Sequence, residues 1–327
     1  RLLVRAEGAT DVGYSGGEPS IDPRFVDIVK RARELGFSHQ SLNTNGLRFK
    51  DAKFCRQVVE AGITSIDFSI HGHVDELHDE LVAKKGALAA VKEACANLRA
   101  LRDEGLKFHL SGTIVVARKN HRELRTIAAF LHSLGITNVR LKYAYEGNLS
   151  HDVIIQQVAP YEDVVPSVVE ALDYLASQRG GFHVTHVPLC LLGDHAAFSS
   201  DYEIRHAAMA SSKETVYGEA GQYFRKSGDE CGRCVLRNLC TRLDGGYEKL
   251  RERPALKPFE TEADVEAMFD RADARFPMAK NHVKRMRSTW QRNREAALPE
   301  SLTLGPAAAH PGTPVKLSVK RTEAAKP

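Results

Sequence analysis

Four of the six cysteines stand at spacings that suit a metal centre. Cys231, Cys234 and Cys240 lie close together, and Cys190 lies upstream of them. A C-x2-C pair supplies two thiolates from one turn of the chain. Four thiolates complete a tetrahedral zinc site or hold an iron–sulfur cluster. The spacing alone leaves both interpretations open, and the cysteines are too sparse for a small disulfide scaffold.

A glycine-rich turn is the second candidate site. Ser15-Gly16-Gly17-Glu18-Pro19 directly follows a run that is typical of a β-strand. Two adjacent glycines let the backbone approach a ligand where a Cβ atom would interfere. From these residues alone, a tight turn between a strand and a helix explains the pair equally well.

Two histidines form the third candidate. His71 and His73 end another strand-like run, and an H-x-H pair at such a position is how some metal-dependent hydrolases place two zinc ligands. A hydrolase of this kind needs further ligands at later strand ends. There the sequence offers only His109, Lys142 and Glu146, so the pattern favours histidines that line a polar cavity.

Alternating strands and helices must position these groups. The helices carry apolar residues at helical spacing, with Cys55 and Cys95 as small core residues on those faces, and each helix ends at a glycine. Strands that alternate with helices indicate parallel pairing, with ligands at the carboxyl ends of the strands. The predicted strands are 11–14, 39–42, 65–70, 107–116 and 138–145.

The fold class predicted from this alternation is α/β. Five units do not close a barrel, but a sixth strand before Arg1 gives a partial (β/α)6 TIM-like barrel, and the start at Arg1 favours an N-terminally truncated chain. A small C-terminal extension follows, in which 182–187 is strand-like. The expected parts are a barrel core at 1–180, a cysteine module at 181–250, a helical segment at 251–297 and a disordered tail at 298–327.

Composition and charge exclude several classes of protein. Hydrophobic residues make up 43% of the 327 residues and charged residues 27%, as in ordinary globular proteins. No apolar run is long enough to span a membrane and no signal peptide is present, so we expect a cytoplasmic protein. The net charge of +4 is too small to indicate nucleic-acid binding. We expect the basic residues between Lys280 and Arg294 to form a solvated helix face.

Three motifs in register resemble the radical S-adenosylmethionine (SAM) superfamily. They are Gly16-Gly17-Glu18-Pro19, Asn43-Thr44-Asn45-Gly46 and Ser69-Ile70-His71-Gly72, and the resemblance covers about residues 8–150. It implies that the first motif meets the amino group of S-adenosylmethionine through its backbone. It also implies that Ser69 contacts the ribose or carboxylate and that Asn45 lies at the same cavity. The family's G-x-I-x-G-x-x-E motif is matched only in its first half, which implies adenine contacts at Gly112 and Ile114.

The cysteine loop that defines this family is absent from the sequence. No C-x3-C-x2-C occurs, so the ligands of the catalytic [4Fe–4S] cluster are expected upstream of Arg1, and this polypeptide alone is expected to be inactive. The C-terminal C-x2-C-x5-C resembles the SPASM/twitch extensions of the family, with Asp244 where the fuller version has a cysteine. The resemblance therefore implies an auxiliary [4Fe–4S] cluster on Cys190, Cys231, Cys234 and Cys240.

The implied activity is reductive cleavage of S-adenosylmethionine to a 5′-deoxyadenosyl radical, which removes hydrogen from a substrate. The implied partners are a reductant such as flavodoxin or ferredoxin and a peptide or protein substrate. Two alternatives stay open. One is a non-catalytic barrel that binds S-adenosylmethionine or a partner peptide, and the other is the zinc-dependent hydrolase that uses His71 and His73.

Overall fold

The structure is a computed structural model that describes residues 10–144, 156–200 and 253–293. Between the last two ranges it describes 225–226, 229–237, 239–240, 243–244 and 247. The predicted tail at 298–327 and Glu146 lie outside the described residues. No helix among the described residues is both long and apolar enough to cross a membrane.

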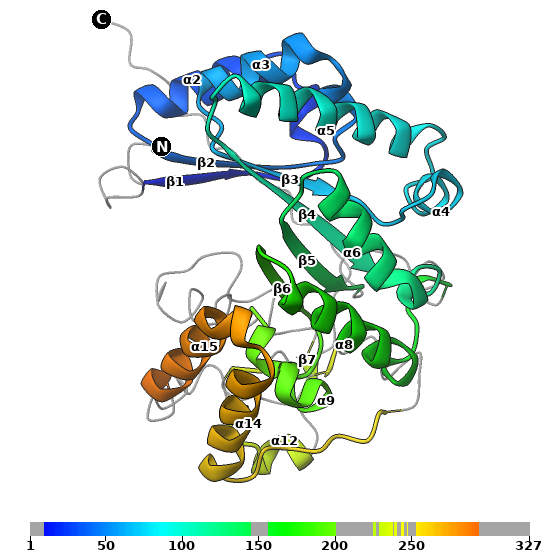
Figure 1. Cartoon of the computed structure of the whole chain (residues 1–327), viewed down its shortest axis with the longest axis vertical. Coiled ribbons are helices and arrows are strands. Elements are labelled where there is room, and N and C mark those ends of the chain that lie inside the picture. The colour runs from blue at the N-terminus through cyan, green and yellow to red at the C-terminus, as the bar shows by residue number, and fades with distance from the viewer. Residues whose placement is uncertain are drawn as a thin grey trace, which may run out of the picture. The chain divides into compact units, whose positions relative to one another are not determined.

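Six parallel strands form one sheet whose spatial order follows the chain (Figure 1). This order, with helices between the strands, is that of a TIM-like barrel that has not closed, and β1 and β6 are its edge strands among the described residues. The strands are β1 (Asp11–Tyr14), β2 (His39–Thr44), β3 (Ser65–Ser69), β4 (His109–Val116), β5 (Asn138–Tyr143) and β6 (Gly181–Thr185).

The sixth strand corrects the sequence analysis. The five predicted strands are present, and residues 181–185 add a sixth strand to the same sheet. It pairs in parallel with β5, with Arg140 opposite His183. The reason is that the helix at 161–177 is another crossover helix, which returns the chain to the same sheet. The sheet therefore extends past residue 180, into the region that was assigned to the cysteine module.

The helices pack their apolar residues against the buried face of the sheet, and together they form the hydrophobic core. The strands alternate between buried and more accessible residues, as in β5, where Val139, Leu141 and Tyr143 are buried. Cys55 and Cys95 are 0% and 1% exposed, which confirms them as core residues, and burial raises the pKa of each thiol to about 12. The helices are α2 (Phe25–Glu34), α3 (Ala52–Ala61), α4 (Asp75–Leu81), α5 (Ala87–Asp103), α6 (Leu124–Ser133) and α8 (Tyr161–Ser177).

The other face of the sheet is polar. Residues in register on neighbouring parallel strands point to the same face, so the accessible positions of β2 to β6 form one surface. We call this surface the polar face. Its polar residues are His39, Ser41, Asn43, Ser65, Asp67, Ser69, His109, Ser111, Thr113, Asn138, Arg140, Lys142, His183 and Thr185, of which Thr113 and Thr185 are buried.

Two helices close the described chain, α14 (Glu262–Arg275) and α15 (Lys280–Asn293), as expected for a helical segment. Thr261 and Asp264 form a reciprocal cap at the start of α14. Asp173 of α8 contacts His195 at 2.8 Å and Arg275 of α14 at 2.8 Å, which ties α14 to the crossover helix. The shorter elements before these helices are α9 (Leu189–Leu192), β7 (Arg225–Lys226), α12 (Asp229–Arg233) and β8 (Leu243–Asp244).

Candidate functional site

The glycine pair after β1 exposes its backbone. Gly16 and Gly17 have φ angles of +88° and +58°. Residues with a Cβ atom rarely adopt such backbone angles. Among the described residues, apart from the chain neighbours, no heavy atom lies within 4 Å of the position that a Cβ would take at either glycine. Glycine is therefore needed here for backbone conformation, and the space beside it is open.

Glu18 braces this turn against the end of β2. Its Oε1 accepts hydrogen bonds from the Thr44 hydroxyl at 2.7 Å and from the Ser20 hydroxyl at 2.6 Å and amide at 3.1 Å. Its Oε2 accepts one from the Asn45 amide at 2.7 Å. One carboxylate thus joins the first two motifs, and we call this arrangement the Glu18 brace. The adjoining Pro19 begins the short helix Pro19–Ile21.

Asn45 and Ser69 end neighbouring strands at the same level. Thr44 is in register with Phe68, so the next residues along, Asn45 and Ser69, lie side by side. The Asn45 side chain accepts a hydrogen bond from the Leu47 amide at 3.0 Å, which fixes its own turn. Ser69 is half-buried on the polar face. The structure therefore brings together, at the carboxyl ends of β1 to β3, the residues Gly16, Gly17, Glu18, Asn45 and Ser69.

Gly112 and Ile114 face the opposite way. A Cβ at Gly112 would lie 2.6 Å from Leu131 of α6, and Ile114 is fully buried among the helices. Their neighbours Thr113 and Val115 take the polar-face positions because side chains alternate along a strand. The Cβ direction at Gly112 and the side chain of Ile114 both point away from the site. Adenine contacts at these two residues would therefore have to use backbone atoms.

The histidines that follow β3 are engaged in structural hydrogen bonds. His71 Nδ1 accepts from the Val115 amide at 3.2 Å, and His78 Nδ1 accepts from the His71 amide at 3.1 Å. Burial and the neighbouring His78 lower the pKa of His71 to about 4, so its neutral ring carries its proton on Nε2. His73 instead pairs with Glu123 at 3.3 Å. His71 Nδ1 is occupied by the Val115 amide and His73 Nδ1 faces Glu123, so the arrangement does not favour zinc coordination by His71 and His73.

A row of four polar side chains crosses β3, β4, β5 and β6. The Thr113 hydroxyl donates to Asp67 at 2.7 Å, Asp67 faces the Arg140 guanidinium at 3.8 Å, and Arg140 Nε donates to His183 Nε2 at 2.6 Å. We call these four residues the polar row. Sequence reasoning missed it, because each strand contributes a single residue and no spacing along the chain links them.

The four candidate cysteines line one cavity. Cys190, Cys231, Cys234 and Cys240 all border it, with Leu189, Leu243 and Leu256 among its apolar lining. In the described part of the chain, no group of three or more His, Cys, Asp or Glu side chains is placed to hold one metal ion. A mononuclear zinc site needs all four sulfurs about 2.3 Å from one point. An iron–sulfur cluster binds each cysteine through a different iron and tolerates wider spacing.

Backbone amides point at these sulfurs. The Leu189 amide donates to Cys240 Sγ at 3.4 Å, and amides of Phe259 and Leu236 donate to Cys234. Burial, together with the nearby thiols of the other three cysteines, raises the pKa of Cys190 to about 12. Burial also raises the pKa of Cys234, so without a metal the Cys190 and Cys234 thiols stay neutral. The amide donors suit sulfurs that carry negative charge, so the residues present fit a thiolate-bound metal group.

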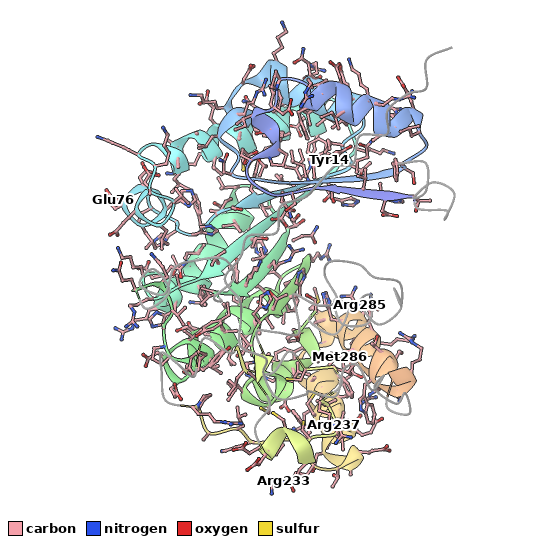
Figure 2. All side chains as sticks on the ribbon, turned by 180° about the vertical axis from the view of Figure 1, so that it is seen from behind. Tyr14, Glu76, Arg233, Arg237, Arg285 and Met286 are labelled. Atoms are coloured by element: carbon pink, nitrogen blue, oxygen red, sulfur yellow. The ribbon has the colours of Figure 1, made fainter. Side chains whose placement is uncertain are left out.

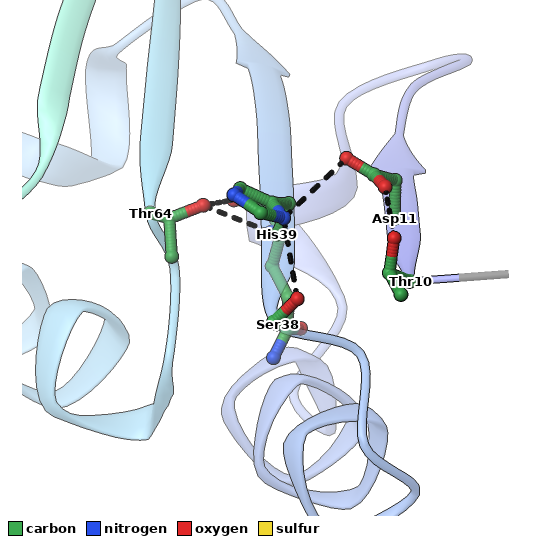
Figure 3. Close-up of polar contacts among 6 residues, drawn as sticks. Thr10, Asp11, Ser38, His39 and Thr64 are labelled. Carbon is green, nitrogen blue, oxygen red and sulfur yellow. Dashed lines mark hydrogen bonds and ion pairs between the residues drawn. The ribbon is translucent and has the colours of Figure 1, made fainter.

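A depression lies at the other end of the strands. It measures about 850 Å³ and is bordered by the amino ends of β1 to β4. Figure 3 shows its polar rim, where His39 contacts Asp11 at 3.7 Å and Ser38 at 3.2 Å. The His39 side chain is 70% exposed. Ligands of parallel α/β folds bind at the carboxyl ends, so we interpret this rim as solvated surface.

Part of the chain matches a known family model. Residues 1–131 match the family model of the Radical SAM superfamily. A 7,8-dihydro-6-hydroxymethylpterin dimethyltransferase of Methanocaldococcus jannaschii is 30% identical over 82 residues, which are 25% of this chain and 16% of that protein. A probable GTP 3′,8-cyclase of Saccharolobus solfataricus is 26% identical over 196 residues, covering 50% of this chain and 63% of that protein. The chain therefore spans less than two thirds of the length of either relative.

A solved structure shares the fold. The structure of anSMEcpe with bound AdoMet and a bound peptide has a TM-score of 0.52 to this chain at 15% identity. The likeness covers 86% of this chain and 89% of that one. It supports the partial barrel with a C-terminal extension as the architecture.

Proposed function

Residues 1–131 belong to the radical SAM superfamily, and on that premise we propose that the intact protein is a radical SAM enzyme that modifies a peptide or protein. S-adenosylmethionine, bound to a reduced [4Fe–4S] cluster, supplies a 5′-deoxyadenosyl radical that removes a hydrogen atom from the substrate. The six cysteines include no C-x3-C-x2-C, so the ligands of that cluster are not among residues 1–327. We further propose a cytoplasmic protein that takes electrons from a flavodoxin or ferredoxin.

The observation that carries this proposal is the Glu18 brace beside two open glycines. The brace fixes the turn after β1, so the Gly16 and Gly17 backbone is preorganised to bind the methionyl amino group. Ser69 and Asn45 lie at the same edge of the sheet and would bind the ribose or carboxylate end. The polar face then holds the substrate next to the cofactor.

The cysteine cavity would hold an auxiliary [4Fe–4S] cluster through Cys190, Cys231, Cys234 and Cys240. The amides that point at the sulfurs would stabilise the thiolates and tune the reduction potential. Because four cysteines are available, the cluster would be fully ligated by protein, which favours a role in electron transfer or structure. The bound peptide of anSMEcpe supports the peptide substrate by analogy of fold.

Anaerobic reconstitution of this chain with iron and sulfide tests the auxiliary site. We expect one cluster per chain and its loss in Cys234→Ala and Cys240→Ala. Cys55→Ala removes a buried core thiol and serves as the matched control, which should keep the cluster. A colourless protein with one equivalent of zinc would overturn the iron–sulfur assignment.

The full-length gene product tests the catalytic proposal. With dithionite it should convert S-adenosylmethionine to 5′-deoxyadenosine, and Glu18→Ala should slow this conversion more than Arg31→Gln, an exposed control. A gene product without C-x3-C-x2-C, or one that forms no 5′-deoxyadenosine, would leave the non-catalytic barrel as the better interpretation.

A further inference from the structure

Arg140 is held in one orientation by its neighbours in the polar row. Its Nε donates to His183 Nε2 at 2.6 Å, and its Nη1 lies 3.8 Å from Asp67 Oδ2. Within the described residues, no hydrogen-bond partner is recorded for its Nη2. The side chain is 37% exposed, so one end of a fixed guanidinium remains accessible on the polar face.

The charge of Arg140 is only loosely compensated. A 3.8 Å separation from Asp67 is longer than a charge-assisted hydrogen bond, and the other Asp67 oxygen already accepts from Thr113 at 2.7 Å. The partner at Nε adds no negative charge. His183 is neutral, because burial, Arg140 and the nearby His282 and Arg285 lower its pKa to about 3. Figure 2 shows Arg285 on α15.

A second, independent observation comes from Thr185. Its side chain is on the polar face, one pleat beyond His183 toward the carboxyl end of β6. Thr185 is 4% exposed, and in the part of the chain that the structure describes its Oγ1 has no hydrogen-bond partner. A buried hydroxyl without a partner costs free energy that a bound polar group would recover. Arg140 Nη2 and Thr185 Oγ1, on adjacent strands of the same face, thus have no hydrogen-bond partner among the described residues.

We infer that Arg140 and Thr185 bind an oxyanion, a carboxylate or phosphate group, of the substrate that occupies the polar face. A planar guanidinium presents paired N–H donors that match such a group, and a hydroxyl adds a third donor. Asp67 and His183 are positioning residues that hold the guanidinium in place. The inference deepens the proposed function, since it takes the polar face as the substrate face and adds the chemical class of the group recognised there.

The test measures anion binding by this chain with isothermal titration calorimetry at constant ionic strength. The probes are inorganic pyrophosphate, inorganic phosphate and acetate. For the anion that binds best we expect Arg140→Gln to weaken affinity about tenfold and Arg140→Lys to weaken it less. Arg31→Gln is the matched control, because Arg31 is an exposed arginine paired with Glu34 at 2.8 Å. The Arg31→Gln variant should bind the anion with the same affinity as the parent chain.

Thr185→Val keeps the proposal testable if the Arg140 variants fail to fold. It preserves the shape of the side chain and removes a hydroxyl that has no partner, so the chain should stay folded and bind the anion several-fold more weakly. Equal affinities in the parent chain, Arg140→Gln and Thr185→Val, or no binding of any probe by the parent chain, would overturn the inference.

The arms of the experiment separate the sources of the oxyanion. Preference for pyrophosphate indicates a phosphorylated substrate, and preference for acetate indicates a carboxylate such as an acidic peptide provides. S-adenosylmethionine carries a carboxylate too. If it displaces the bound anion, Arg140 belongs to the cofactor site and the assignment to the substrate is overturned. None of these measurements depends on cluster reconstitution or 5′-deoxyadenosine, so failure here is distinct from failure of the proposed function.

Discussion

The Glu18 brace and the polar row organise two parts of the same sheet by different means. In the brace, one carboxylate accepts four hydrogen bonds from three residues, two of them backbone amides. In the row, four strands contribute one side chain each, and the shortest contact joins Arg140 to His183 at 2.6 Å. The brace is therefore a rigid local structure, whereas the row depends on the register of the whole sheet.

This difference predicts where each part is vulnerable. The brace should fail when one residue, Glu18, is lost. The row should tolerate the loss of one member with a small change in stability, because its ends are also held by strand pairing. Loss of one member of the polar row should still change anion binding by Arg140, since the orientation of Arg140 depends on Asp67 and His183.

Acid should act on the polar row and on the motif after β3, and it should give the largest effect. His71 of that motif has a pKa of about 4, and His183 of the row has a pKa of about 3, both below the ordinary value of 6.5. Each contributes stability that is complete above pH 6.5 and falls as the pH drops toward the folded pKa. Lowering the pH from 7 to 4.5 should reduce the free energy of unfolding by about 2 kcal/mol for each histidine.

Urea unfolding at several pH values measures this loss. His71→Gln and His183→Gln should each flatten the pH dependence between pH 4.5 and 6.5, while His39→Gln, an exposed control, should not. An unchanged slope in His183→Gln would mean that this histidine is protonated in the folded protein, and that Arg140 is not its donor.

Glu18→Ala should have the next largest effect. Removing the carboxylate leaves the Thr44 hydroxyl, the Ser20 amide and hydroxyl and the Asn45 amide without their acceptor, which should cost about 3 kcal/mol. Glu18→Gln keeps one oxygen and should cost less. Urea unfolding measures both variants. A cost below about 1 kcal/mol, the typical net value of one hydrogen bond, would show that the brace is not rigid.

Gly112→Ala should have the next largest effect and lower the free energy of unfolding by about 2 kcal/mol, because its Cβ would lie 2.6 Å from Leu131 in a close-packed core. Gly16→Ala should cost about 1 kcal/mol through its φ of +88° alone, since the space beside it is open. Thermal unfolding of the two variants compares steric cost with backbone cost. If Gly16→Ala proved the more harmful, the turn after β1 would be more tightly packed than its open surroundings indicate.

Asp67→Asn should have the smallest effect on stability, below about 1 kcal/mol, since the amide still accepts from Thr113 and the contact with Arg140 is long. Anion affinity measured as above should nevertheless change, because Arg140 loses its charged neighbour. A loss of several kcal/mol would instead make the row a structural element.

Local patterns predicted most of the fold and the first half of the site. Gly16, Gly17 and Glu18 form a contiguous motif whose conformation depends on nearby backbone, so residue types sufficed. Arg140 and His183 are separated by the whole of α8, and only strand register sets them side by side. The orientation of Gly112 and Ile114 was missed for the same reason: a motif in a strand does not reveal which face meets the helices. The strand-like run at 182–187 was predicted but assigned to the C-terminal extension, because a glycine-rich run after a long helix resembles the start of a new domain.

The cysteine cavity also fixes an order of events during synthesis. Its walls include Cys190, the C-x2-C turn and the segment around Leu256, and the Val235 amide is bonded to the Phe259 carbonyl at 2.8 Å. The barrel strands are complete by Thr185, so the sheet can fold while this later segment is still inside the ribosome. The cavity closes last. A metal group held by all four cysteines can therefore bind only after Cys240 has been synthesised, which is later than every strand of the sheet.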